Sequence, residues 1–315
     1  MKHCSISRFL RDSPVPLRIA IVTDEPGWHG AQLTAWFAAN GATAQYVALT
    51  ACHLNLSASR HGLVLGDYAT ALPDAVFVRG IPGGSLEAVT LRLDVLHHLA
   101  ALGVPVFNSA LAIERTVDKA RTSLLLQQHG IATPPTFVGG DLATVTAYVR
   151  QQLAAGVTLV KKPLFGSQGK GLRRIRAVAD LNYLMPGEIA YLQQFVGRDC
   201  SPYRDCRVLV IDGRAVAAME RQSHHWITNR AQGASCHALT LDAELAALAE
   251  RATVAVGADY AGVDLLRDET DCWLVTEVNG IPAWQGLQQA TGIDISALLG
   301  RALLRRLNTG VTRGA

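Results

Sequence analysis

The sequence predicts a mixed fold in which a parallel α/β domain precedes α+β lobes. Three observations predict it: strands alternate with helices in the first 115 residues, a glycine-rich loop interrupts the middle of the chain, and two hairpins follow that loop. The chain has 315 residues, of which 49% are hydrophobic and 17% charged. This composition supplies enough apolar surface for two or three cores and argues against a disordered chain.

The charge and composition exclude several classes of protein. Lys and Arg number 29 and Asp and Glu 26, without a long basic run, so we expect no nucleic-acid partner. No stretch reaches the roughly 18 to 20 apolar residues that span a bilayer, and residues 1–16 lack the apolar segment of a signal peptide. We therefore expect no membrane partner and a cytoplasmic location. The six cysteines form no C-x-x-C pair, which argues against a zinc site or a disulfide framework.

The first domain is predicted over residues 1–115. A helix between the first two strands ends at Gly41, and a second helix begins after Ser85, a residue type that caps helix N-termini. Strands that alternate with helices in this way form a parallel sheet covered on both faces. The predicted strands are 17–23, 44–49, 74–80 and 104–108.

Two further parts follow. Residues 116–192 are predicted to form a small α+β lobe, and residues 193–315 a larger lobe. In the larger lobe the pair Asp212-Gly213 is a strong signal for a tight hairpin turn. The small-lobe elements are helices at 117–130 and 141–154 and strands at 157–162 and 172–177; a strand at 189–196 follows, and the larger lobe has hairpins at 205–221 and 260–279 and a helix at 242–256.

The hairpin at 260–279 carries a candidate metal site. Glu277 and Asn279 are two residues apart and so share one face of a strand. Asp264 and Glu277 are equally far from the centre of the turn, so Asp264 should lie across from Glu277 or diagonal to it. Carboxylate and amide oxygens are ligands that Mg²⁺ prefers. In an isolated pattern of this kind, a solvated strand end is the alternative explanation for one of the acids.

A glycine-rich loop at 160–171 is a candidate phosphate site. Gly166, Gly169 and Gly171 leave backbone N–H groups free to fold over phosphates, and Lys162 precedes the loop at a strand end. The loop is neither a Walker motif nor a dinucleotide fingerprint. Taken without the rest of the sequence, the loop is equally well explained as a glycine-rich hairpin turn with no ligand. Lys119 is a weaker candidate because most helix lysines are simply solvated.

A third candidate is the loop that contains Arg221, Asn229 and Arg230. A guanidinium there could clamp a carboxylate or a transferring phosphoryl group. His224 and His225 are adjacent, so on a strand they point to opposite faces, which argues against a shared metal. No nucleophile motif of the G-x-S-x-G type is found in the chain, which leaves covalent hydrolase chemistry unsupported.

Standing in fixed order, these motifs resemble the ATP-grasp ligases. With "YLQQFV", "WITNRAQG" and "TEVNGIPAWQGLQQ", the chain resembles the RimK-type α-L-glutamate ligases over about residues 75 to 305. The resemblance implies an ATP-grasp fold with an N-terminal pre-ATP-grasp domain. Two departures stand out: Gln194 replaces a usual glutamate, and Ile227 replaces the arginine of the ribosomal-tail ligase. The sequence around Asn229 resembles LysX-type ligases and the ligases of C1 coenzymes more than it resembles the ribosomal-tail ligase.

The resemblance also implies roles for individual residues. It implies metal binding by Asp264, Glu277 and Asn279 and catalysis by Arg221, Lys162 and Asn229. It implies substrate binding by Arg207, Arg221 and Asn229. We add Arg79 as a substrate-binding candidate, because the first-domain loops at 24–30 and 79–84 could hold the acceptor; ordinary loop structure is the alternative. The implied nucleotide-binding residues are Lys119, Lys162, Gly166, Ser167, Gln168, Gly169, Gln193, Gln194, Phe195 and Asp205.

The implied activity is an ADP-forming ligase that uses ATP and Mg²⁺, two ions of it, with Mn²⁺ as a substitute. It would add L-glutamate through its α-amine to a carboxylate on a small-molecule acceptor, a tetrahydromethanopterin or methanofuran-type coenzyme precursor. The first alternative is a LysX-like ligase that acts on a carrier-protein or peptide C-terminus. A non-catalytic nucleotide-binding regulator and a structural interaction module are further alternatives, but neither needs the metal triad. The chain could also assemble with copies of itself as a homo-oligomer.

Overall fold

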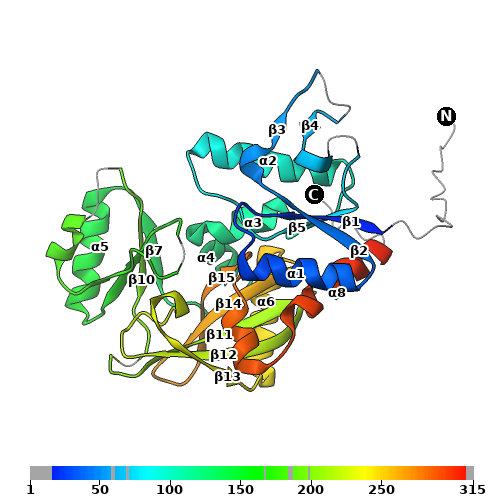
Figure 1. Ribbon diagram of the computed structural model, residues 1–315. Coiled ribbons are helices and arrows are strands. Elements are labelled where there is room, and N and C mark those ends of the chain that lie inside the picture. The colour runs from blue at the N-terminus through cyan, green and yellow to red at the C-terminus, as the bar shows by residue number, and fades with distance from the viewer. Residues whose placement is uncertain are drawn as a thin grey trace, which may run out of the picture.

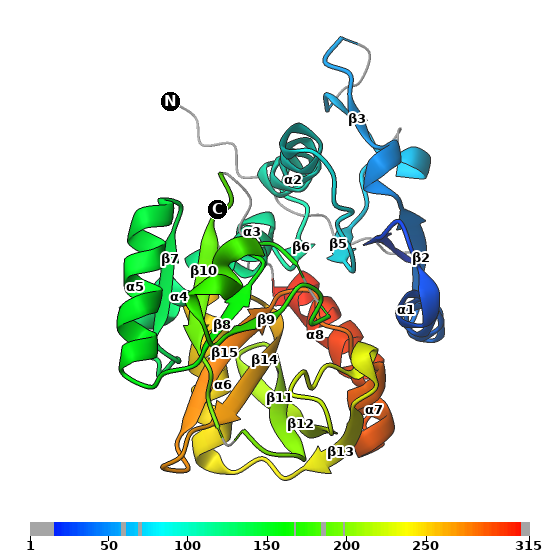
Figure 2. The same ribbon diagram turned by 90° about the vertical axis from the view of Figure 1, so that its left-hand side faces the viewer.

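The computed structural model describes residues 16–57, 61–68, 71–166, 168–183, 187–197 and 199–309. Figures 1 and 2 show three parts: an N-terminal domain, a small lobe and a large lobe, each built around its own sheet. Within the described residues, no helix is long and apolar enough to cross a membrane. Short 3₁₀ turns lie at Leu49–Ala51, Gly66–Tyr68, Val178–Tyr183 and Arg230–Gln232.

The N-terminal domain contains the predicted parallel sheet, with strand order β2-β1-β5-β6. Helix α1 (Gly27–Ala39) and helix α2 (Leu86–Ala101) cover opposite faces. Alternation along β1 explains this, because Ile19 and Ile21 pack with α1 while Ala20 and Val22 pack with α2. The strands are β1 (Leu17–Val22), β2 (Ala42–Val47), β5 (Ala75–Val78) and β6 (Val106–Phe107), with an unpredicted side hairpin of β3 (His53–Leu54) and β4 (Leu63–Val64).

The small lobe is an antiparallel sheet of order β7-β10-β8-β9 backed by helix α5 (Leu142–Ala154). Val145 and Val149 of α5 pack on the sheet, and Asp141 caps the helix. The predicted boundary after residue 192 falls inside β10, because this strand continues to Gln194. The strands are β7 (Thr136–Gly139), which the sequence pattern did not reveal, β8 (Leu159–Lys162), β9 (Arg173–Ile175) and β10 (Ala190–Gln194).

The large lobe is a five-stranded antiparallel sheet of order β13-β12-β11-β14-β15. Helix α6 (Ala243–Val256) packs on one face. Helices α3 (Ala110–Val117) and α4 (Lys119–Gln128) join the same core through side chains such as Leu126, so the helix predicted within the small lobe packs with the large lobe. The strands are β11 (Tyr203–Ile211), β12 (Arg214–Ser223), β13 (Ser235–Leu239), β14 (Tyr260–Arg267) and β15 (Trp273–Asn279).

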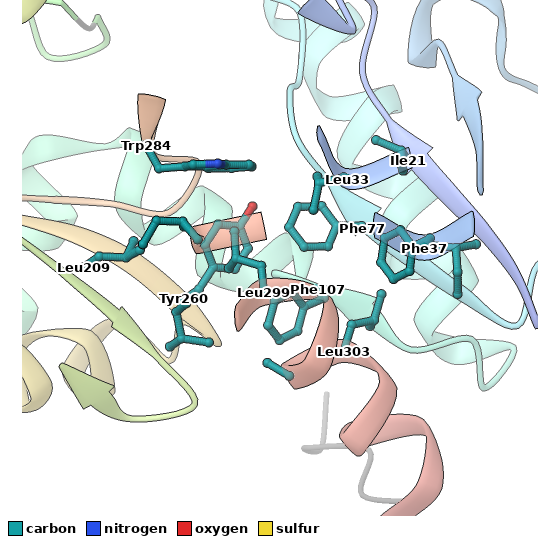
Figure 3. Packing of buried hydrophobic residues seen from close by; sticks show 14 of the residues in the cluster. Ile21, Leu33, Phe37, Phe77, Phe107, Leu209, Tyr260, Trp284, Leu299 and Leu303 are labelled. Atoms are coloured by element: carbon teal, nitrogen blue, oxygen red, sulfur yellow. The ribbon is translucent and has the colours of Figure 1, made fainter. Parts of the chain in front are cut away.

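A continuous apolar core joins the N-terminal domain to the large lobe (Figure 3). Phe77 and Phe107 from the first sheet pack against Tyr260 at the start of β14, whose hydroxyl donates to the carbonyl of Val78 at 2.7 Å. Trp284 precedes helix α7 (Gln285–Thr291), and helix α8 (Ile295–Thr309) returns to pack on the first sheet. The N-terminal domain is therefore fixed to the strands that carry the candidate metal residues.

Asn108, just after β6, adds polar bonds to this junction. Its buried side chain donates to the carbonyls of Tyr260 and Gly280, at 2.7 and 2.6 Å, and accepts from the amide of Tyr260 at 3.1 Å. These residues lie at the start of β14 and just after the end of β15. One side chain thus joins the two strands of the candidate metal hairpin at their open end, away from the turn.

Candidate active site

A cavity of about 780 Å³ lies between the small and large lobes. This is within the range of small-molecule sites. Its walls include both predicted lysines, the glycine loop and the hairpin carboxylates. The predicted residues that line it are Lys119, Lys162, Gly166, Gln168, Gly169, Gln193, Gln194, Phe195, Asp205, Arg221, Asn229, Asp264 and Glu277.

Three predicted residues have a different placement, and the structure does not describe a fourth. Asn279, Arg207 and Arg79 are not among the residues that line the cavity. Ser167 lies outside the described residues. Asn279 and Arg207 lie on the large-lobe sheet next to the lining residues Glu277 and Asp264, whereas Arg79 lies at the junction with the N-terminal domain.

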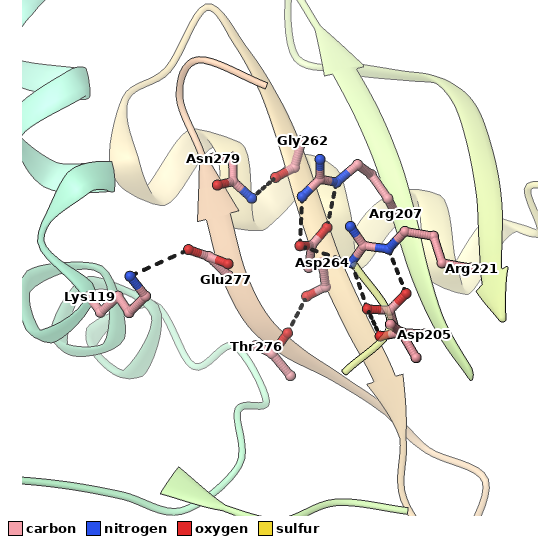
Figure 4. Close-up of polar contacts among 10 residues, drawn as sticks. Lys119, Asp205, Arg207, Arg221, Gly262, Asp264, Thr276, Glu277 and Asn279 are labelled. Carbon is pink, nitrogen blue, oxygen red and sulfur yellow. Dashed lines mark hydrogen bonds and ion pairs between the residues drawn. The ribbon is translucent and has the colours of Figure 1, made fainter. Parts of the chain in front are cut away.

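The hairpin pairing predicted from the turn is confirmed. Asp264 on β14 lies directly across from Glu277 on β15, and Gly262 across from Asn279. A bulge follows Asp264, and Figure 4 shows the three predicted metal ligands on this pair of strands. The amide nitrogen of Asn279 donates to the carbonyl of Gly262 at 3.4 Å, which leaves the amide oxygen for other partners.

Two arginines and two aspartates form a largely buried arginine–aspartate network beside the hairpin: Asp205, Arg207, Arg221 and Asp264 (Figure 4). Arg207 binds Asp264 through two hydrogen bonds of 2.6 and 2.7 Å. Arg221 binds Asp205 through two of 2.7 and 2.6 Å and contacts Asp264 at 3.1 Å. Thr228 donates a further bond of 2.7 Å to Asp205. Two positive and two negative groups balance, as buried charges require.

The network shifts the pKa values of its members. Burial raises the pKa of the Asp264 carboxyl, but Arg207 and then Arg221 outweigh burial and bring that pKa down to about 2. At Asp205, burial raises the pKa and Arg221 opposes the rise without cancelling it. Burial lowers the pKa of Arg221, and the two aspartates more than restore it. Asp264 is therefore held as a carboxylate, the form that binds a metal ion.

The two lysines occupy less balanced surroundings. Lys162 donates to the side-chain oxygen of Gln193 at 2.6 Å, and Gln193 is oriented by its own bond to Thr136 at 3.0 Å. Burial lowers the pKa of Lys162, Glu277 partly opposes this, and the cation of Lys119 lowers it further. Lys162 thus has a neutral partner and lacks a directly bound carboxylate among the described residues. A phosphate would supply the missing negative charge.

Lys119 links the glycine loop to the hairpin. Its ammonium group donates to the carbonyl of Gly166 at 2.8 Å and lies 3.7 Å from a carboxylate oxygen of Glu277 (Figure 4). The Glu277 side chain is 26% exposed, so it faces the cavity rather than the core. The sequence-based argument that helix lysines are usually solvated does not apply here, since the Lys119 side chain is only 11% exposed.

The glycine loop contacts the loop after β12. A Cβ built on Gly169, whose φ is +70°, would lie 2.5 Å from the Asn229 side-chain oxygen and 2.7 Å from Ile227. Only glycine permits both this backbone angle and this approach. Gln232 also donates to the carbonyl of Gln168 at 3.3 Å. The loop therefore covers one side of the cavity.

Contacts around Phe195 and Trp226, which both line the cavity, include a residue that the sequence reasoning missed. Arg174 on β9 stacks on Phe195 at 4.1 Å and on Trp226 at 4.9 Å, and it is paired with Asp199 at 2.6 Å. These contacts join the two lobes at the end where Phe195 lines the cavity. No spacing in the sequence indicates them, because Arg174 and Trp226 meet only through the docking of the lobes.

The hairpin fits a magnesium ion. Asp264 and Glu277 supply carboxylate oxygens on adjacent strands and Asn279 an amide oxygen, which is the donor chemistry that Mg²⁺ prefers. In the described part of the chain, no three His, Cys, Asp or Glu side chains gather as a metal site. Metal binding here therefore depends on Asn279 and on oxygens from a substrate, as is usual for Mg²⁺ beside phosphates.

Comparison with known proteins identifies two family profiles and several relatives that match most of the chain. The RimK PreATP-grasp domain profile matches residues 17–113, and the RimK-like ATP-grasp domain profile matches residues 116–303. A tetrahydromethanopterin:alpha-L-glutamate ligase of Methanococcus maripaludis is 37% identical over 230 residues, which is 70% of this chain and 75% of that protein. The alpha-aminoadipate–LysW ligase LysX of Saccharolobus solfataricus is 31% identical over 208 residues, 63% of this chain and 74% of that protein.

Solved structures show the same fold. The ATP-grasp ligase PsnB, in complex with a phosphomimetic variant of a minimal precursor, Mg and ADP, superposes with a TM-score of 0.73 at 20% identity. The superposition covers 92% of this chain and 98% of that one. The predicted ATP-grasp fold with an N-terminal pre-ATP-grasp domain is confirmed.

Proposed function

Because the chain belongs to the family of RimK-like ATP-grasp proteins, we propose that it is an ADP-forming ligase that joins the α-amine of L-glutamate to a carboxylate of an acceptor. One observation carries the proposal. A single cavity brings together the cations of Lys119 and Lys162, a glycine loop, and the carboxylates of Asp264 and Glu277. This arrangement suits a triphosphate held between positive groups and a metal ion.

We propose a small coenzyme precursor of the tetrahydromethanopterin type as the acceptor. The tetrahydromethanopterin:alpha-L-glutamate ligase of Methanococcus maripaludis is 37% identical to this chain, against 31% for LysX. A methanofuran-type precursor has the same reacting group, a carboxylate, and belongs in the same set of candidates. The cytoplasmic location and the homo-oligomer remain predictions.

The chemistry needs an activated carboxylate, because a carboxylate at neutral pH is a poor electrophile. In the proposed reaction an oxygen of the acceptor carboxylate attacks the γ-phosphorus of ATP, ADP leaves, and the amine of L-glutamate then displaces phosphate from the acyl carbon. Asp264, Glu277 and Asn279 would hold magnesium, which would supply positive charge beside the phosphates. We propose two ions, with Mn²⁺ as a substitute.

The lysines and arginines have distinct parts in this proposal. Lys162 and Lys119 stabilise the negative charge of the phosphates, since neither is neutralised by a tightly bound carboxylate. Arg207 and Arg221 are paired with aspartates, and both contact Asp264 and keep it ionised. Arg221 also lines the cavity, where its charge supports the phosphoryl group together with the Asn229 side chain.

The remaining nucleotide contacts come from the hinge between the lobes. Gln193, Gln194 and Phe195 line the cavity where β10 leaves the small lobe, and Asp205 lies across it on β11. The amides of Gln194 and Phe195 are bonded to the carbonyls of Pro135 and Thr158, at 2.8 and 2.9 Å. These two residues can therefore contact the nucleotide base only through their side chains and carbonyl oxygens.

The glycine loop protects the reaction from water. Gly166, Gln168 and Gly169 border the cavity, and Lys119 holds the carbonyl of Gly166. An acylphosphate hydrolyses in water, so a covered site favours transfer to the amine.

The proposal is tested by an ADP-release screen with Mg-ATP, L-glutamate and a panel of carboxylate acceptors, followed by mass measurement of the product. We expect ADP release that needs both L-glutamate and one acceptor, and a product heavier than the acceptor by one glutamyl residue. Release of ADP without amide formation, or no release with any acceptor, would contradict the proposal.

The second candidate is a LysX-like ligase that acts on a carrier-protein or peptide C-terminus. The loop sequence Trp226-Ile227-Thr228-Asn229 and the 31% identity to LysX favour it. This candidate predicts turnover with an acidic peptide C-terminus and none with a pterin or furan precursor. A non-catalytic regulator would bind nucleotide in the same cavity without releasing ADP.

A further inference from the structure

A second group of cations lies outside the cavity, at the junction of the N-terminal domain and the large lobe. Arg79 directly follows β5, and its guanidinium stacks on the ring of Trp284 at 5.1 Å. It donates to the carbonyl of Ile281 at 3.4 Å, and its Nε is buried with no hydrogen-bond partner in the described residues. Figure 3 shows Trp284 at this junction, beside the aromatic residues that join the two domains.

Arg79 lacks a carboxylate partner. It takes part in no ion pair with any described residue, and burial lowers the pKa of its guanidinium. A buried cation is costly unless an anion compensates it. The missing anion is therefore expected from outside the chain.

Arg230, from the loop after β12, adds a second uncompensated cation. Its guanidinium donates to the side-chain oxygens of Gln285 and Gln289, at 3.2 and 3.1 Å, and both are neutral groups. Unlike Arg79, it is exposed, so solvent screens its charge.

His29 lies close to both arginines and does not add a charge. Its Nε2 accepts from the amides of Trp284 and Gln285 at 3.2 and 3.3 Å, so the ring is neutral with its proton on Nδ1. Burial, then Arg79 and Arg230, lower the pKa of His29 to about 4. The local charge is positive, with a neutral imidazole N–H donor beside the two guanidiniums.

This cluster adjoins the candidate metal hairpin. Ile281 and Pro282 follow β15 after Gly280, and a Cβ built on Gly262 would lie 2.9 Å from Pro282 and 3.5 Å from the Arg207 side chain. The chain from Asn279 to Trp284 thus connects the hairpin to Arg79. A substrate that reacts beside the hairpin could extend a second charged group toward Arg79.

We propose that Arg79 and Arg230, beside His29, form a subsite for a substrate carboxylate that does not react. Guanidinium groups bind carboxylates bidentately, and Arg79 is held by its stacking on Trp284. The carboxylate comes either from L-glutamate or from the acceptor. This identification of the source rests on the proposed function, whereas the binding of a carboxylate at Arg79 does not.

The binding test titrates glutarate, a plain dicarboxylate, into the full chain and its variants by calorimetry. We expect Arg79→Gln to weaken glutarate binding roughly 10- to 100-fold, the range for a lost charge-assisted bond. Arg230→Gln should weaken glutarate binding by a smaller factor. Because Arg230 is exposed, this variant tests the subsite even if the Arg79 variant does not fold. Equal affinity in the wild-type and Arg79→Gln chains, or no binding to the wild type at millimolar glutarate, overturns the proposal.

Arg92→Gln is the matched control. Arg92 also lacks a carboxylate partner among its hydrogen bonds, and it holds the same loop by donating to the carbonyls of Pro82 and Gly83, both at 2.7 Å. If Arg79 acted only by shaping this loop, Arg92→Gln would weaken glutarate binding equally, and the subsite would be wrong. We expect its affinity to stay within twofold of the wild type.

The kinetic test identifies the source of the carboxylate. In the ADP-release assay, Arg79→Gln should raise the KM of one carboxylate substrate at least tenfold and leave the KM of ATP unchanged. A rise for L-glutamate assigns the subsite to the amino acid, and a rise for the acceptor assigns it to the acceptor. An equal rise for ATP contradicts the subsite. If the wild type binds glutarate through Arg79 but releases no ADP, the ligase proposal fails and the subsite stands.

Discussion

The molecule holds its cations in two contrasting ways. In the arginine–aspartate network, Arg207 and Arg221 are each bound to a carboxylate at 2.6 to 2.7 Å and the charges balance. Lys162 and Arg79 are also largely enclosed, yet their hydrogen bonds go to the neutral oxygens of Gln193 and Ile281. Balanced cations position other groups, whereas unbalanced ones are prepared to receive an anion from a ligand.

Breaking the balanced network should have the largest effect on stability. Asp205→Asn removes one of two negative charges from a buried cluster and leaves Arg221 to share Asp264 with Arg207. We expect a loss of about 3 to 5 kcal/mol in the free energy of unfolding, as for other broken buried pairs. Urea denaturation measures it.

Asp199→Asn is the control for this variant. Asp199 also pairs with two arginines at 2.6 Å, but its side chain is 48% exposed. We expect this substitution to cost at most about 1 kcal/mol, the usual worth of a surface pair. Equal losses for the two variants would contradict the distinction between a buried network and a surface pair.

Removing the charge of Glu277 should stop catalysis with little effect on folding. Glu277→Gln keeps the shape of a side chain that faces the cavity but weakens the hold on magnesium. We expect the rate of ADP release to fall by a factor of 100 or more, which corresponds to about 3 kcal/mol of transition-state stabilisation. The exposed Glu244 provides the control variant Glu244→Gln. Wild-type rates in Glu277→Gln would exclude a metal-binding role.

The glycine loop offers a smaller test of how the cavity is covered. A methyl group at Gly169 would collide with Asn229 and Ile227 and must also adopt a positive φ. We expect Gly169→Ala to reduce turnover roughly tenfold by preventing the close approach of the two loops. Gly156→Ala shares the positive φ of +76° but meets no atom within 4 Å. If both variants have the same turnover, contact between the loops is unimportant.

The smallest effect concerns His29 and pH. Its pKa is lowered to about 4, chiefly by burial, from 6.5. Between these values the unfolded chain binds a proton that the folded chain does not, so this group makes stability fall as pH drops from 6.5 to 4. Solvent screening of the partly exposed ring reduces the effect to about 1 kcal/mol.

His29→Gln can still accept a hydrogen bond from the backbone but does not titrate. The difference in unfolding free energy between pH 7 and pH 4.5 should therefore shrink by about 1 kcal/mol in this variant, measured by urea denaturation. An unchanged pH dependence would show that His29 is protonated equally in both states.

Features set by local chemistry could be predicted from the sequence. The Asp212-Gly213 turn and the Ser85 cap form as expected, because each depends on a few neighbouring residues. The pairing of Asp264 with Glu277 could be predicted by counting residues along both strands from the turn that joins β14 to β15. In contrast, strand β13 and helix α3 were missed, since they have only five and eight residues and so give a short pattern.

The network of charges could not be predicted by the same counting. Counting outward from the Asp212-Gly213 turn places Glu220 opposite Asp205. A bulge between Leu209 and Val210 shifts the register by one residue and brings Arg221 opposite Asp205 instead. The role of Arg174 was invisible for another reason, because its partners Phe195 and Trp226 meet it only when the lobes dock.

The most direct test of the central claim is the binding of Mg-ATP to Lys162→Met, measured by calorimetry together with the unfolding free energy of the nucleotide-free chain. Without nucleotide, the variant should be at least as stable as the wild type, because it removes a buried cation bonded to a neutral group. Its affinity for Mg-ATP should fall roughly 10- to 100-fold, and Lys162→Arg, which keeps a cation, should lose less. Unchanged affinity in Lys162→Met would contradict the placement of the phosphates beside Lys162, and with it the ligase site.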